Sequence, residues 1–331
     1  MKSTCHDYAI IVTCNPGYGF GLMASMNAQN YFGTHADWEI AYDGFDQEYM
    51  DKVSNAFPFK VNWTPVSELM EDVVDKRTDQ TAALERMWLS YWLLAHKVLK
   101  EKKYKAVCVI QADQFVFVNL DPYFKLAEEG YLIGAEQAFS YHKLEDLPFG
   151  NDEGIWDRSM CAAFDGVNFI GQQHTQFPMD TVHFQEEDSF DGEANHSVVA
   201  LNRSYCRHGQ KNNVLGLDRA VWTCDHIWPY TKLRVHVDND RIYNDRNVQL
   251  KGWHCRWWQI GRVAGEWLNN KQSMIDNKDN AEVMGWLENM ELNYNVVKSF
   301  MERFNDMIPE IKSEQYVKGI IRRPRYELGE E

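Results

Sequence analysis

Long hydrophobic runs are missing from this chain of 331 residues. The longest apolar stretches, such as Ala106–Ile110 and Phe115–Val118, fall far short of the roughly 18–20 residues that a membrane-spanning helix needs. The first residues, Met1 to Asp7, lead into a strand-like stretch without the apolar core of a secretion signal. The sequence therefore predicts a cytoplasmic protein without a membrane span.

Closely spaced cysteine pairs and an excess of basic residues are also missing. The seven cysteines form no Cys-x-x-Cys pair, which favours reduced thiols in a cytosol. Lys and Arg number 34 against 49 Asp and Glu, and the resulting net charge of −15 repels polyanions. Binding to nucleic acid is therefore not expected, although the tail Arg322-Arg323-Pro324-Arg325 is locally basic.

The rest of the composition is that of a folded globular protein, with 44% hydrophobic and 25% charged residues. Aromatic residues are abundant, at 14% of the chain with 12 Trp. Proteins that handle sugars or bases often present such rings for stacking. This excess is a hint and does not define a site.

Strand-like and helix-like stretches alternate along the chain. The clearest helix is predicted at Gln80–Glu101, where apolar residues recur at helical spacing. The expected strands are Tyr8–Cys14, Trp38–Asp43, Phe59–Trp63, Lys105–Ile110, Ser197–Leu201 and Leu233–Val237, and a further helix is expected at Leu22–Phe32, ending at Gly33. This alternation predicts an α/β sheet with crossover helices.

The predicted domain organisation is one domain with a helical appendage. Between residues 140 and 193 the periodic pattern is lost, which indicates an inserted region of functional loops. Residues 261–312 are mostly amphipathic and helical in pattern. Because neither an internal repeat nor a Gly/Ser-rich linker occurs, we expect a domain at 1–260 and a helical extension at 261–331.

The most informative stretch follows the apolar run Lys105–Ile110. It continues as Gln111-Ala112-Asp113, then a short apolar run, then Leu120-Asp121-Pro122-Tyr123-Phe124. Ligands of open α/β sheets bind beyond the carboxyl ends of strands, so Asp113 is expected at such a position. An oxygen ligand there could hold Mg²⁺ or Mn²⁺ against a diphosphate. The alternative is a surface carboxylate that caps a turn.

This stretch resembles the glycosyltransferases of the GT-A fold, particularly the glycogenin-like and bacterial galactosyltransferase-like group. Their strand ends in Asp-x-Asp and is followed by a short apolar strand and a Leu-Asp-x-x-Phe turn. The resemblance extends weakly over most of residues 8–257. It implies a GT-A-like, Rossmann-like fold with a mixed, mostly parallel sheet flanked by helices. It also implies an enzyme that moves a sugar from a nucleoside diphosphate, with a UDP-sugar favoured, to a glycan, a protein or a small molecule. Here Gln111 replaces the first aspartate, and its amide oxygen brings no charge.

The resemblance also implies three groups of site residues, with residues 140–193 as acceptor-side loops. The residues expected to contact the nucleotide or its diphosphate are Thr13, Asn15, Tyr18, Arg86, Asp113 and Lys251. The residues expected to hold Mn²⁺ or Mg²⁺ are Asp113 and His254. The catalytic candidates at the reacting sugar are Asp225 and Gln111, and Asn195 is expected on the acceptor side. A carboxylate such as that of Asp225 would stabilise an oxocarbenium-like transition state.

Each of these candidates has a purely structural alternative. The loop Gly17–Gly21 could be a tight turn that needs glycine for its backbone conformation. Arg86 could be a solvated helix charge, and His254 could be a partly buried imidazole beside Trp253. Asp225 could bond loop amides rather than a substrate.

Other functions remain open. The glycine-rich loop does not match Gly-x-Gly-x-x-Gly, and only Asp43 could serve as its acidic partner, so a dinucleotide site has weak support. A structural zinc site could be drawn from Cys224-Asp225-His226 and His254-Cys255. These residues lack the usual spacing of zinc ligands, so this alternative has little support. The neutral Gln111 makes a non-catalytic nucleotide- or glycan-binding protein plausible. A viral-type transferase acting on a DNA base is opposed by the net charge of −15.

Overall fold

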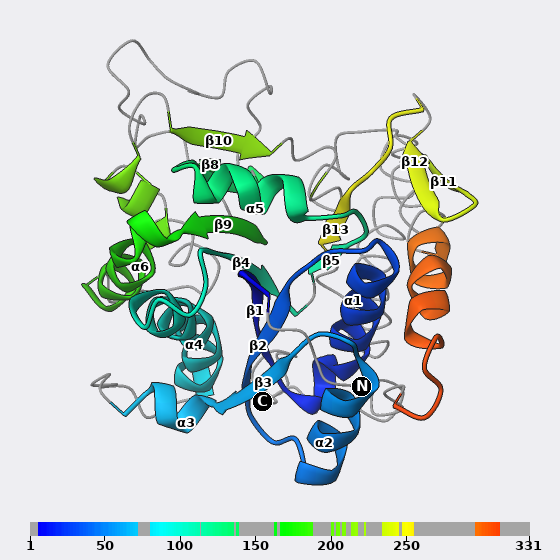
Figure 1. Ribbon diagram of the computed structural model, residues 1–331, viewed down its shortest axis with the longest axis horizontal. Helices are drawn as coiled ribbons and strands as arrows, with labels where there is room; N and C mark the ends of the chain where they lie inside the picture. Colours follow the sequence, from blue (N-terminus) through cyan, green and yellow to red (C-terminus); the bar gives the residue numbers. More distant parts are fainter. Residues whose placement is uncertain are drawn as a thin grey trace, which may run out of the picture.

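A seven-stranded sheet lies at the centre of the computed structural model (Figure 1). The structure describes residues 6–71, 80–112, 114–135, 137–138, 162–163, 166–187, 200–201, 203–205, 207–209, 213–217, 222, 234–244, 247–254 and 295–311. Across the sheet the strand order is β10-β6-β9-β4-β1-β2-β3. The strands are β1 Tyr8–Cys14, β2 Asp37–Tyr42, β3 Val61–Pro65, β4 Ala106–Gln111, β6 Leu132–Ala135, β9 Val167–Gly171 and β10 Val214–Leu217.

Most neighbouring strands of this sheet are parallel. Strands β1, β2, β3 and β4 form a parallel block, and β10 is parallel to β6. Strand β9 lies between β4 and β6 and is antiparallel to both. Strands β1 and β4 are apolar along most of their length because helices bury both of their faces. The predicted fold class, a mixed and mostly parallel sheet flanked by helices, is confirmed.

Helices cover both faces of the sheet. They are α1 Gly19–Tyr31, α2 Gln47–Ala56, α3 Val66–Leu69, α4 Gln80–Lys100, α5 Asp121–Glu128 and α6 Gln176–Glu187. On β1, Ile10 and Val12 pack with residues of α1, α2 and α5, whereas Ala9 and Ile11 pack with residues of α3, α4 and α6. Figure 1 shows α4 and α6 on one side of the sheet and α1 on the other. Successive side chains of a strand point to opposite faces, so β1 contributes to two separate cores.

Two of the helix boundaries agree closely with the sequence prediction. Helix α4 begins and ends within a residue of the predicted limits. Helix α1 ends at Tyr31, two residues before Gly33. The φ of Gly33 is +72°, the left-handed conformation that favours glycine after a helix. None of the helices in the described part of the chain is long and apolar enough to cross a membrane.

Three small two-stranded sheets extend the fold. Strand β5 (Gln114–Val116) pairs with β13 (Gly252–His254), β11 (Val235–Asp238) with β12 (Arg241–Asn244), and β7 (Gln137–Ala138) with β8 (Ala162–Ala163). All three pairs are antiparallel. The β5–β13 pair is the important one, since it joins a segment late in the chain to the strand that follows Gln111–Asp113.

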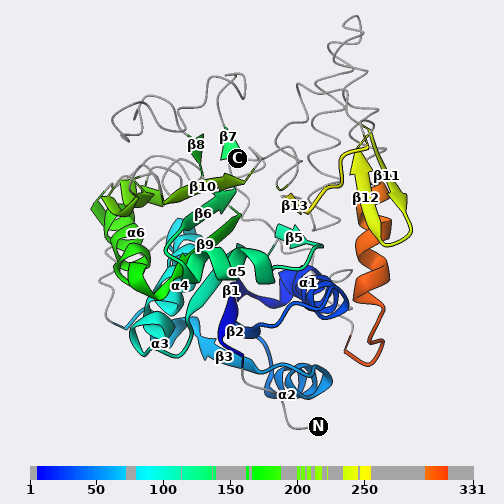
Figure 2. The same ribbon diagram turned by 45° about the horizontal axis from the view of Figure 1, so that its top comes forward.

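A helix at residues 295–305 covers part of this extension. Its buried residues, Val297, Phe300, Met301 and Phe304, form a third core with α1, β5 and the β11–β12 hairpin. Figure 2 shows this helix, in orange, beside the hairpin. The helix agrees with the predicted helical extension at 261–331, and the remaining residues of that extension lie outside the described part. The boundary at residue 260 stays a prediction.

The sequence prediction is wrong for part of the loop region 140–193. Residues 167–171 form the inner strand β9, and residues 176–187 form α6. The hydrophobic pattern did not identify α6 because polar residues occupy some of its buried positions. Those residues are paired with side chains that are distant in the sequence. The buried Thr181 donates its hydroxyl hydrogen to Ser204 Oγ at 2.7 Å, and Asp180 Oδ2 lies 2.6 Å from His208 Nε2. Such pairs allow polar side chains at buried positions that a hydrophobic pattern does not identify.

The strand predicted at Ser197–Leu201 is also wrong where it is described. Ala200 and Leu201 are helical, as are 203–205 and 207–208. The buried Tyr205 donates its hydroxyl to Asn168 Oδ1 of β9 at 2.9 Å. At the described residues, packing against the sheet therefore outweighs local β-propensity.

Replacing Phe300 should test the third core. Phe300 is fully buried against the rings of Phe115, Phe117 and Phe304. We expect Phe300→Ala to lower the free energy of unfolding by about 3–5 kcal/mol, because the truncation leaves a cavity. The control Met307→Ala, at a side chain that is 44% exposed, should change it by less than about 0.5 kcal/mol. Equal losses in urea unfolding of the two variants would contradict this packing.

Candidate functional site

The carboxyl ends of β1, β2 and β4 lie side by side. Thr13 is paired in register with Ala41 on one side and with Gln111 on the other. The loops after these parallel strands therefore leave the sheet at one edge, where open α/β sheets bind ligands. This edge brings Gln111 into the same row as the predicted nucleoside residue Thr13.

The loop after β1 is a short 3₁₀ turn, η1 (Pro16–Tyr18). Asn15 Oδ1 accepts a hydrogen bond from Gly17 N at 2.9 Å, and Tyr18 N donates to Asn15 O at 2.9 Å. Asn15 thus caps the turn. The structural alternative for the loop Gly17–Gly21, a tight turn whose glycines need a left-handed backbone, is wrong, since Gly17, Gly19 and Gly21 do not have a positive φ. Tyr18 is half-buried and packs against the core. Contacts of Asn15 and Tyr18 with a nucleoside stay predictions.

The start of α1 touches the loop after β4. A Cβ atom added to Gly21 would lie 2.5 Å from Ala112 O, so a side chain here would collide with the backbone. Glycine at this position therefore allows α1 to approach the Gln111–Asp113 segment. Gly21 was not among the predicted site residues, although it belongs to the glycine-rich stretch that the sequence singled out.

Helix α4 is fastened to the same edge. Thr13 is only 6% exposed, and its Oγ1 lies 2.8 Å from Ser90 Oγ of α4. Arg86 precedes Ser90 by four residues, about one turn, and so lies on the same side of the helix. The backbone of Arg86 is therefore near the edge, and its side chain lies outside the described part of the structure.

The thiol at the end of β1 is not a nucleophile. Burial raises the pKa of Cys14 far above its ordinary value, and Cys14 Sγ donates to Asn15 O at 3.3 Å. Burial likewise raises the pKa of Cys108 in β4. Both side chains are protonated at neutral pH, so they act as apolar packing groups.

The pairing of β13 with β5 completes the edge. His254 lies opposite Gln114, Trp253 opposite Phe115 and Gly252 opposite Val116. Because Gln114 directly follows Asp113, the pairing brings the backbone of His254 beside the end of the Gln111–Asp113 segment. Asp113 itself and the side chain of His254 lie outside the described residues. Their role as metal ligands stays a prediction.

Lys251, directly before β13, is held against aromatic rings. Its Nζ donates to Tyr123 Oη at 2.8 Å and lies 5.6 Å from the Tyr123 ring centroid and 5.8 Å from that of Trp222. The two rings meet edge to face, with centroids 5.0 Å apart. This arrangement fixes the cation through a hydrogen bond and cation–π attraction. Neither ring was among the predicted site residues, although Tyr123 belongs to the Leu120–Phe124 stretch that the sequence singled out.

Two further predicted site residues, Asp225 and Asn195, lie outside the described part, as do Cys224, His226 and Cys255. Among the residues that are described, no three His, Cys, Asp or Glu side chains are grouped so that they could hold a metal ion. The predicted metal is therefore not located by the described side chains. The zinc alternative is not tested either.

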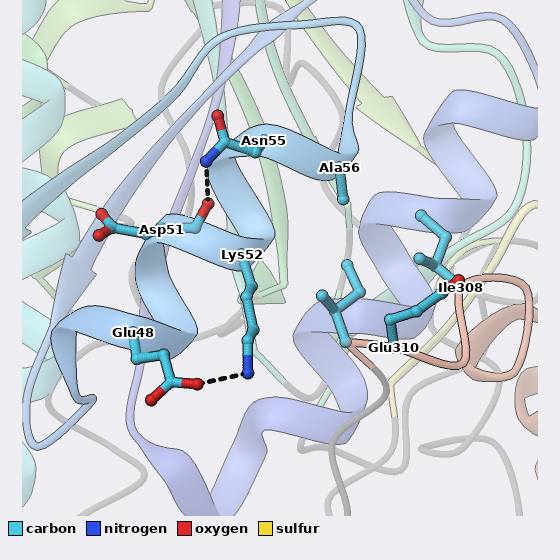
Figure 3. Close-up of a pocket in the computed structure, with 8 residues that line it drawn as sticks. Glu48, Asp51, Lys52, Asn55, Ala56, Ile308 and Glu310 are labelled. Carbon is cyan, nitrogen blue, oxygen red and sulfur yellow. Dashed lines mark hydrogen bonds and ion pairs between the residues drawn. The ribbon is translucent and has the colours of Figure 1, made fainter.

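A surface pocket of about 610 Å³ lies elsewhere, between α2 and residues 308–311 (Figure 3). Its charged residues are partly paired, since Lys52 Nζ donates to Glu48 Oε1 at 2.6 Å. Ile308 and Ile311 contribute apolar surface. None of the predicted site residues lines this pocket, so it is separate from the edge described above.

No protein-family model and no curated protein matches the chain. Solved structures do match. The glycosyltransferase GlyE of Streptococcus pneumoniae TIGR4 matches at 10% identity and a TM-score of 0.39, over 65% of this chain and 46% of that one. The bifunctional glycosyltransferase WbbM matches at 10% identity and a TM-score of 0.44, over 65% of this chain and 39% of that one.

A third match is the galactosyltransferase LgtC, solved in complex with donor and acceptor sugar analogs. Its identity is 14% and its TM-score 0.44, over 75% of this chain and 87% of that one. The chain thus spans less than half the length of GlyE and WbbM. All three are named as glycosyltransferases, the class whose GT-A fold the sequence resembles. At these identities and TM-scores the likeness carries no weight for the activity of this protein.

Gly252 should be intolerant of a side chain. A Cβ atom there would lie 2.6 Å from Trp222 O and 3.3 Å from Phe115 O. We expect Gly252→Ala to cost about 1–3 kcal/mol of unfolding free energy, because β13 must move away from Trp222 or from β5. Urea unfolding measures the change. An unaltered stability would show that β13 does not lie against Trp222 in solution.

Proposed function

We propose that the protein is a glycosyltransferase that moves a sugar from a nucleoside diphosphate, with a UDP-sugar as the favoured donor, to a glycan, protein or small-molecule acceptor. The observation that carries this proposal is the β5–β13 pairing. It brings Lys251 and the backbone of His254 to the strand that begins directly after Asp113. A cation and a proposed metal-ligating motif on one pair of strands suit a diphosphate leaving group.

The donor would lie across the carboxyl ends of β1 and β4. The loop with Asn15 and Tyr18 would contact the nucleoside, with Thr13 beneath it. Lys251 would face the diphosphate, since the hydrogen bond to Tyr123 uses only one of its three ammonium hydrogens. Arg86 would add a second positive charge from α4. These cations would offset the charge that develops on the departing diphosphate.

The residues near Asp113 suit Mn²⁺ or Mg²⁺. A carboxylate from Asp113 and an imidazole from His254 form an oxygen and nitrogen set that favours Mn²⁺, and the amide of Gln111 could add a neutral oxygen. When bound, such an ion would neutralise negative charge on the diphosphate. Because Gln111 replaces a carboxylate, this set carries one negative charge fewer than an Asp-x-Asp pair, and we expect weaker metal binding.

At the reacting sugar, the proposal assigns two catalytic groups. Gln111 would hydrogen-bond a sugar hydroxyl or approach the ion, and Asp225 would stabilise positive charge on the anomeric carbon. Asn195 would contribute on the acceptor side. Donor identity and stereochemical outcome depend on side chains around this centre.

A second candidate function is a nucleotide- or glycan-binding protein without turnover, which the neutral Gln111 favours. Both functions predict that a nucleotide stabilises the fold, because a ligand of the native state raises the melting temperature. Only the transferase releases nucleoside diphosphate from a nucleotide sugar. A panel of nucleotide sugars, scored for both effects with and without Mn²⁺, distinguishes the two.

The variant Asp113→Asn tests the proposed metal and donor site. We expect turnover of the active nucleotide sugar to fall about a hundredfold or more, because the amide removes charge that orients the ion and diphosphate. Asp51→Asn makes the same chemical change in the α2 pocket and should retain full activity. If folded Asp113→Asn retains wild-type turnover, Asp113 is not part of the active site.

The variant His254→Ala tests metal ligation through pH. An imidazole must be neutral to bind a metal, so UDP affinity in Mn²⁺ should fall as the pH drops through ~6.5, the ordinary pKa of histidine. His254→Ala should lose that pH dependence and most of the affinity. His236→Ala, at an exposed position of β11, should keep both. Should His254→Ala unfold more easily yet bind UDP with the normal pH profile, His254 is a packing residue.

A further inference from the structure

We infer that Gln114, the residue directly after Asp113, is a positioning residue of the donor site, an inference that rests on the proposed function. Its side chain is fully buried. Gln114 Nε2 donates to Trp222 O at 2.9 Å. Within the described part of the chain, Gln114 Oε1 accepts no hydrogen bond. The amide therefore makes one directed bond, which ties the Trp222 backbone to the first residue of β5.

Three segments of the chain meet at this amide. Gln114 belongs to β5, Trp222 precedes the catalytic candidate Asp225 by three residues, and Gly252 belongs to β13. A Cβ atom on Gly252 would lie 3.0 Å from Gln114 Nε2 and 2.6 Å from Trp222 O. The absence of a side chain at Gly252 thus leaves room for the bond between the other two residues.

The bond also bears on Lys251. The Trp222 ring is one of the two rings beneath the Lys251 ammonium group, and the Trp222 carbonyl is the acceptor of the Gln114 amide. If the carbonyl moves, the ring moves with it. Gln114 therefore acts on the diphosphate-binding cation through Trp222, without having to touch the nucleotide.

A comparison with Gln29 argues against a purely structural role for Gln114. Gln29, in α1, is also buried, and both ends of its amide are paired. Its Nε2 donates to Val116 O at 2.6 Å and its Oε1 accepts from Thr34 Oγ1 at 2.7 Å. Among the described residues, the buried Oε1 of Gln114 has no such partner, a state that is unfavourable in a core. An apolar side chain would fill that place at lower cost unless the single bond to Trp222 were needed.

Gln114→Met separates positioning from stability. Methionine matches glutamine in length but cannot donate to Trp222 O, so Trp222 and Lys251 should lose their fixed position. We expect the Kd for UDP, measured by titration calorimetry with and without Mn²⁺, to rise roughly tenfold or more. The matched control Gln29→Met loses one hydrogen bond to Val116, at the other end of β5, and one to Thr34. It should lower the melting temperature at least as much and leave the Kd within about twofold of wild type.

Each outcome decides the question. A tenfold loss confined to Gln114→Met supports the inference, whereas wild-type affinity in folded Gln114→Met overturns it and leaves the proposed function intact. Equal losses in both glutamine variants also overturn it, since they would reflect a general weakening of β5. If Gln114→Met fails to fold, Gln114→Asn, whose amide ends one carbon short, carries the same expectations. Failure of the wild type to bind UDP overturns the proposed function and this inference with it.

Discussion

Backbone hydrogen bonds between β5 and β13 hold together two parts of the chain that are far apart in sequence, and the candidate site depends on them. Without this pairing, Lys251 and His254 would have no fixed relation to the Gln111–Asp113 segment. The pairing is possible because Gly252 leaves room for Trp222 O on one side and for Phe115 O on the other. A second glycine, Gly21, lets α1 approach Ala112 in the same way. Close backbone approach at two glycines therefore gives this edge its shape.

In the first half of β2, away from the candidate site, polar residues have a structural role. Asp37 and Glu39 are buried there, and Glu39 accepts hydrogen bonds from Tyr104 Oη at 2.7 Å and from Lys103 Nζ. Asn62 Nδ2 donates to the same carboxylate at 2.9 Å. Buried charges with this many partners stabilise a fold and are not available to a ligand. The Lys251 ammonium group, by contrast, contacts two aromatic rings and one hydroxyl.

Part of the candidate site could be predicted from the sequence, and part could not. Asp113, Lys251 and His254 were singled out by resemblance. The β5–β13 pairing places the backbone of His254 opposite Gln114, and the roles of all three residues stay predictions. The same reasoning missed Gly21, Tyr123 and Trp222, because their importance lies in what they contact and not in their residue type. For Thr13 and Asn15 the structure shows intramolecular partners, Ser90 Oγ and Gly17 N. A contact of this kind cannot be recognised in a short motif.

The sequence by itself determined the strands β1 to β4 and the helices α1 and α4, since a continuous apolar run or a helical repeat records burial within one short segment. It also placed Asp113 after a strand end. It did not predict α2 and α3. Only the tertiary structure decided that β9 lies between β4 and β6, that α6 is a buried helix, and that β13 pairs with β5. These pairings join segments that are distant along the chain. They depend on backbone hydrogen bonds and on polar partners such as Ser204 for Thr181, which no local pattern of residues encodes.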